Sequence, residues 1–134
     1  MSHSVLLSMT KAVGYLGDIE SAQHLLVTLE STLASDVPKI EAAIHAPDFE
    51  LLQTKWHQLK GFAPVFCSDA LVEEIFRTEK LCQHTLPGPT QSVAPNEALN
   101  EAQNQALKAS KELLKQLKQL HAEVLAQLAN QDQL

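Results

Sequence analysis

The sequence predicts an all-α protein of one domain, residues 1–134. Aromatic residues make up only 4% of the chain and hydrophobic residues 45%, with Leu and Ala abundant, which favours helices and a folded core. Apolar residues recur every three or four positions in four long segments. Such segments bury their apolar faces best in an antiparallel up-down four-helix bundle, here with a short extra N-terminal helix.

The first two helices are expected on either side of a glycine turn. The short N-terminal helix covers about residues 3–14 and ends near Gly14 and Gly17. Asp18 is placed to cap the second helix, in which we expect a kink at Pro38. The apolar stripe of this second helix contains Ile19, Ala22, Leu26, Leu29, Leu33, Val37, Ile40 and Ile44.

Three further helices complete the expected core bundle, at about residues 18–130. Asp48 is a plausible cap for the third helix, whose end is blurred by Pro64, and Ser68 or Asp69 caps the fourth. Three prolines and a glycine make about residues 85–95 a loop, and the last helix covers about residues 96–130. The apolar residues of the third and fourth helices are Phe49, Leu52, Trp56, Leu59, Ala63, Leu71, Val72, Ile75, Phe76 and Leu81.

Charge and composition exclude several classes of protein. A net charge of -6 argues against binding to nucleic acid or to an anionic membrane surface. No apolar run approaches the length needed to span a bilayer, and the N-terminus does not look like a secretion signal, so we expect a cytoplasmic protein. Cys67 and Cys82 are expected to be buried small hydrophobic residues.

The informative stretch surrounds His57 in the third helix. Trp56 and its apolar neighbours point toward the core, which turns His57 roughly 120° away and toward solvent. Gly61 lies one turn later on the same side, and a side chain there would crowd the imidazole or a bulky partner. Lys60 can bring a cation to the same surface, where it would support a phosphoryl group. A neutral imidazole nitrogen is a competent nucleophile near neutral pH.

The run His57-x-Leu59-Lys60-Gly61-x-Ala63 resembles the signature of histidine-containing phosphotransfer (HPt) domains, commonly His-Ser-Leu-Lys-Gly-Ser-Ala or Ser. The resemblance covers about residues 18–82. It includes an Asp-x-Pro helix at residues 36–38, the Asp-initiated helix that follows Pro47, an apolar residue at position 71 and Glu79 where the family has a Leu-Glu pair. Three residues depart from the family pattern. Phe62 replaces a small polar residue, Pro64 enters the helix one turn after Lys60, and Cys67 replaces a glycine.

The resemblance implies that His57 accepts a phosphoryl group from the aspartate of one receiver domain and donates it to another. The partners would be receiver domains of response regulators or hybrid sensor kinases. The receiver would supply Mg²⁺, so no cofactor or metal bound by this chain is expected, nor autonomous kinase activity. We expect a monomer that contacts its partner through Thr54, Gln58, Phe62 and Pro64.

Two other functions remain open from the sequence. A metal-dependent enzyme in a bundle core would use Glu-x-x-His ligand pairs, but no histidine here has a glutamate three positions before it. A noncatalytic adaptor of the same fold would dock a receiver or kinase without phosphorylation, and Phe62 and Pro64 are compatible with such docking.

Overall fold

The computed structural model describes residues 6–85 and 96–131. Its helices are α1 (Met9–Leu16), α2 (Ile19–His45), α3 (Phe49–Phe66), α4 (Asp69–Gln83) and α5 (Asn96–Gln131). Within the described residues the extended structure consists of one isolated bridge between Leu7 and Cys67. The predicted all-α fold is therefore confirmed. The predicted loop lies outside the described residues except for Thr85, which ends a turn after α4.

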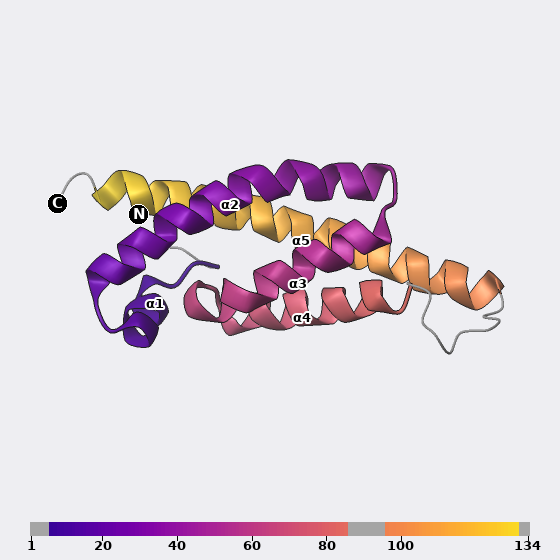
Figure 1. The fold of residues 1–134 in the computed structure, drawn as a ribbon, viewed down its shortest axis with the longest axis horizontal. Helices are drawn as coiled ribbons and strands as arrows, with labels where there is room; N and C mark the ends of the chain where they lie inside the picture. The colour runs from indigo at the N-terminus through magenta and orange to yellow at the C-terminus, as the bar shows by residue number, and fades with distance from the viewer. Residues whose placement is uncertain (1–5, 86–95, 132–134) are drawn as a thin grey trace.

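The four longer helices lie alongside one another, with α2 and α4 running in one direction and α3 and α5 in the other (Figure 1). The most extensive helix contacts are α3 with α4, α2 with α5, and α4 with α5. Their apolar faces meet in one hydrophobic core. The largest fully buried side chains in this core are Trp56, Phe66, Leu26, Leu33, Ile40, Leu52, Leu59, Leu71, Ile75, Leu113, Leu117 and Leu120.

The first helix begins later than predicted and ends at the second of the two predicted glycines. It was expected from about residue 3, but the described residues 6–8 are not helical, and α1 begins only at Met9. Ser8 is its N-cap, because the Ser8 hydroxyl accepts a hydrogen bond from the Lys11 N–H at 3.2 Å. Gly14 lies inside the helix, whereas Gly17 ends it with a φ of 95°, a conformation that favours glycine.

The segment before α1 is extended because its backbone bonds to distant parts of the chain. The backbone N–H groups of Leu6 and Leu7 donate to Glu123 Oε1 at 2.9 and 3.0 Å. The Ser68 N–H donates to the Leu6 carbonyl at 2.8 Å, beside the bridge between Leu7 and Cys67. These long-range bonds take the place of the intrahelical bonds that a helix starting near residue 3 would have made.

The second helix begins at the predicted cap and is tied to α3 by an ion pair. Asp18 caps it through a bond from the Ser21 N–H at 2.7 Å, and Pro38 lies within it without ending it. Asp36 is only 6% exposed and accepts a bond from Lys55 Nζ at 3.1 Å. Ile19 was predicted on the buried stripe but is 55% exposed, because the first residue of α2 precedes the part of the helix that packs on the core.

The third and fourth helices begin at the predicted caps. Asp48 and Ser68 accept bonds from backbone N–H groups three residues later, at 3.1 and 3.3 Å. Pro64 lies in the last turns of α3, which continues to Phe66. Phe76 is the main departure in α4, because it is 46% exposed although it was grouped with the apolar residues of that helix. Its ring lies instead beside Lys60.

The two cysteines are free and buried, as predicted. Burial raises the pKa of Cys67 to about 12 and that of Cys82 to about 11. Both thiols therefore remain protonated near neutral pH.

Across residues 6–85 and 96–131, none of the helices combines the length and the apolar character that a membrane crossing requires.

Candidate functional site

The candidate site lies where the exposed side of α3 meets α4. Trp56 is fully buried and fixes the rotation of α3 by donating from its indole N–H to Ser110 Oγ on α5 at 3.2 Å. His57, the next residue, consequently points away from the core, and 62% of its side chain is exposed. The prediction that His57 faces solvent is confirmed.

Glu79 of α4 joins two of the predicted site residues. Its Oε2 lies 2.8 Å from His57 Nδ1, and its Oε1 accepts a hydrogen bond from Lys60 Nζ at 2.9 Å. The Glu79 side chain is only 5% exposed, whereas that of Lys60 is 31% exposed. One buried carboxylate therefore holds the imidazole and the ammonium together at the surface.

The ionisation of Glu79 determines which nitrogen of His57 is free. Burial alone would raise the pKa of Glu79, but the hydrogen bonds and positive charge of Lys60 and His57 outweigh it and lower the pKa. Glu79 is therefore a carboxylate at neutral pH and can only accept hydrogen bonds. When its ring is neutral, His57 must then carry its proton on Nδ1, which leaves the lone pair on Nε2.

Gly61 lies one turn after His57 on the exposed face of α3. A Cβ atom added at Gly61 would meet nothing within 4 Å. The expectation that a side chain there would crowd the imidazole is thus wrong for a single methyl group. The same openness excludes close helix packing as the reason for this glycine, and it leaves the surface beside His57 accessible from outside.

The residues predicted to contact a partner lie at different places around α3. Thr54 and Gln58 are on its exposed face, where the Thr54 hydroxyl donates to the Glu50 carbonyl at 2.9 Å. Pro64 is half-buried in the last turns of the helix. Phe62 is also half-buried, but it packs against the hydrophobic core on the side of α2. Their roles in partner binding stay predictions.

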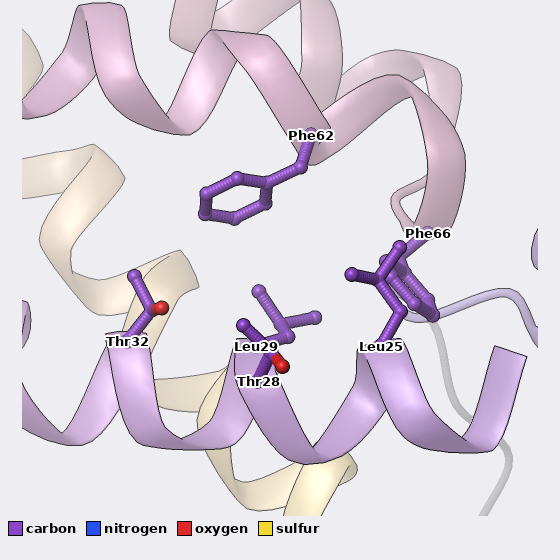
Figure 2. Close-up of a pocket in the computed structure, with 6 residues that line it drawn as sticks. All are labelled: Leu25, Thr28, Leu29, Thr32, Phe62 and Phe66. Carbon is purple, nitrogen blue, oxygen red and sulfur yellow. The ribbon is translucent and has the colours of Figure 1, made fainter. Parts of the chain in front are cut away.

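Phe62 forms one wall of a small apolar pocket between α2 and α3. Figure 2 shows its ring directed from α3 toward Leu29 and Thr32 of α2. The pocket has a volume of about 40 Å³, and its remaining lining residues are Leu25, Thr28 and Phe66. The phenyl ring at this position, where the HPt pattern has a small polar residue, thus faces α2 across this pocket.

Sequence reasoning placed Glu79 only by its position in the family pattern, and it missed Phe76 as part of the site. The available signal for Glu79 was its phase, since it falls between Ile75 and Cys82 on the buried side of α4. A carboxylate at such a position needs a charged or hydrogen-bonding partner. No comparable signal marked Phe76, because the contact depends on how α3 and α4 pack.

Within the described residues, no group of three or more His, Cys, Asp or Glu side chains is arranged to hold a metal ion. Comparison with protein-family models, with curated proteins and with solved structures gives no match. The resemblance to HPt domains therefore depends on the sequence pattern of about residues 18–82 alone.

Proposed function

We propose that this chain is a phosphorelay intermediate that accepts a phosphoryl group on His57 from a receiver aspartate and passes it to another receiver aspartate. The observation that carries the proposal is the cluster of His57, Glu79 and Lys60. It combines an exposed imidazole, a carboxylate on Nδ1 and an ammonium on the same carboxylate. The proposal also depends on the sequence motif around His57.

The cluster is suited to reversible transfer through Nε2 of His57. The Nε2 lone pair attacks the phosphorus of an aspartyl phosphate, an N–P bond forms, and the P–O bond to the aspartate breaks as its carboxylate leaves. The imidazole, which keeps its proton on Nδ1, then carries a positive charge that Glu79 stabilises. In the reverse step an aspartate oxygen attacks phosphorus, and His57 leaves as a neutral ring. Neither direction requires a proton to move.

Lys60 and Gly61 have complementary roles in this proposal. Lys60 supplies positive charge for the phosphoryl oxygens, because its ammonium shares a carboxylate with the reacting imidazole. Gly61 leaves room for the receiver active site, since the space around the place that its Cβ would occupy is open. A glycine in a helix is unfavourable by about 1 kcal/mol relative to alanine, so access for a partner is a physical reason to keep it.

The fold of the chain supports the same proposal. Two pairs of antiparallel helices packed around one core support an antiparallel four-helix bundle with α1 as the extra helix. The receiver would bring Mg²⁺ and the phosphoaspartate, and the chain itself would act as a monomeric carrier without a bound cofactor. We place this carrier in the cytoplasm, where receivers of two-component systems act.

The test is incubation of the full chain with a phosphorylated receiver and Mg²⁺. We expect phosphate that is labile in acid and stable in alkali on the wild type, none on His57→Gln, and full labelling of His24→Gln, another exposed histidine. The phosphorus should be bonded to Nε2, which ³¹P and ¹⁵N NMR can identify. Equal labelling of His57→Gln would overturn the assignment. A wild type that binds the receiver without being labelled would favour the noncatalytic adaptor.

A further inference from the structure

Phe76 is an exposed phenylalanine at the edge of the candidate site. The residue is 46% exposed, so much of the free energy available from burying a phenyl ring is not gained there. The Lys60 ammonium lies 5.5 Å from the centre of the ring. This distance falls within the roughly 6 Å range over which a ring face attracts a cation.

Lys60 is held between Phe76 and Glu79. A lysine side chain has four flexible carbons and loses considerable rotamer freedom when it is fixed. Lys60 is 31% exposed and has both a carboxylate oxygen at 2.9 Å and the aromatic ring beside its ammonium. The ring therefore adds a second attraction that restricts Lys60 to the surface next to His57.

The attractions of Glu79 and of the Phe76 ring differ in how strongly they depend on the orientation of the ammonium N–H groups. A hydrogen bond to Glu79 uses one N–H directed at one oxygen, and the ammonium has three such donors. The attraction by the ring quadrupole depends on the charge and tolerates rotation about the Cε–Nζ bond. The ring can thus keep hold of the ammonium while one of its N–H groups turns toward a phosphoryl oxygen.

We infer that Phe76 is a positioning residue that keeps the Lys60 ammonium at the phosphoryl site during transfer. This inference depends on the proposed function of His57. The ring has no chemical part in the transfer and acts through Lys60. An aliphatic residue of similar size at position 76 would fill the same surface without attracting the cation, whereas another aromatic residue would preserve the attraction.

The experiment measures phosphoryl transfer from a phosphorylated receiver over a range of receiver concentrations. Phe76→Leu should lower the rate at saturating receiver by about two- to fivefold, with little change in the half-saturating concentration. Phe76→Tyr should keep the wild-type rate. Tyr15→Leu is the matched control, because Tyr15 is an exposed aromatic residue on α1, and its rate should not change.

A Lys60→Met background separates positioning from direct contact with the receiver. There Phe76→Leu should have no further effect on the saturating rate. An equal loss in that background, a change confined to the half-saturating concentration, or wild-type transfer by Phe76→Leu would each overturn the inference while leaving the role of His57 intact.

A wild type that takes no label would overturn the proposed function, and the contact itself would then be decided by NMR. The ring current of Phe76 should shift the Lys60 ε-methylene protons, and Phe76→Leu should remove that shift. Unchanged Lys60 resonances in Phe76→Leu would overturn the inference whatever the labelling result.

Discussion

Replacing Gly61 with alanine should make the protein more stable and less active. A glycine inside a helix is unfavourable by about 1 kcal/mol relative to alanine, and the added Cβ would meet nothing within 4 Å that could subtract from this gain. The free energy of unfolding should therefore rise by about 0.5–1 kcal/mol, which corresponds to an increase of about 2–5 °C in Tm. Transfer should slow by about tenfold or more, because a receiver displaced by the methyl group loses its alignment with His57.

Gly14→Ala is the matched control for this prediction. Gly14 also lies inside a helix, and a Cβ added there also meets nothing within 4 Å. Gly14→Ala should gain similar stability and keep the wild-type rate of transfer. Thermal unfolding followed by circular dichroism and labelling by a phosphorylated receiver measure the two effects. A Gly61→Ala variant that is stabilised and transfers at the wild-type rate would refute the reasoning that the glycine serves access.

Three further predictions concern charge and burial. Folding lowers the pKa of Glu79 from its ordinary 4.5, so its carboxylate adds stability above about pH 4.5 that is lost as the pH falls through the folded-state value. In urea unfolding between pH 3 and 7, the stability difference between the wild type and Glu79→Gln should thus shrink in acid, and a constant difference would contradict this role. Lys55→Met should cost about 3 kcal/mol of stability, because it leaves Asp36 buried without its cation; a loss under about 0.5 kcal/mol in denaturant unfolding would show that the pair is unimportant. Cys67 and Cys82 should react with a thiol reagent at pH 8 only in denaturant, and rapid labelling of the native protein would contradict their burial.

Helix positions were predictable from the sequence because their signals are local. The caps Asp18, Asp48 and Ser68 each satisfy a backbone N–H three residues later, and the apolar stripes repeat with the period of a helix. The exposure of His57 followed from the same period once Trp56 was assigned to the core. These predictions needed only the geometry of one helix.

The features that sequence reasoning missed depend on contacts between distant segments. The start of α1 was misplaced because residues 6–8 bond to the α3–α4 turn and to Glu123 rather than to their own helix. The contact between Lys60 and Phe76 depends on the packing of α3 against α4, which periodicity does not specify. Periodicity also placed Ile19 on the buried stripe without showing that the first residue of α2 is exposed.

The bonds from Leu6 and Leu7 to Glu123 join residues 117 and 116 positions apart in the chain. During synthesis, the N-terminal segment leaves the ribosome long before its partner carboxylate exists. Helix α5 also provides the surface on which α2 and α4 pack, so the core stays incomplete over the same interval. Contacts of such separation close only after most of the chain has ordered, and they slow folding. The attachment of Leu6 and Leu7 to Glu123 is therefore among the last steps of folding, and the part of the apolar face of α2 that packs on α5 stays exposed until α5 has formed.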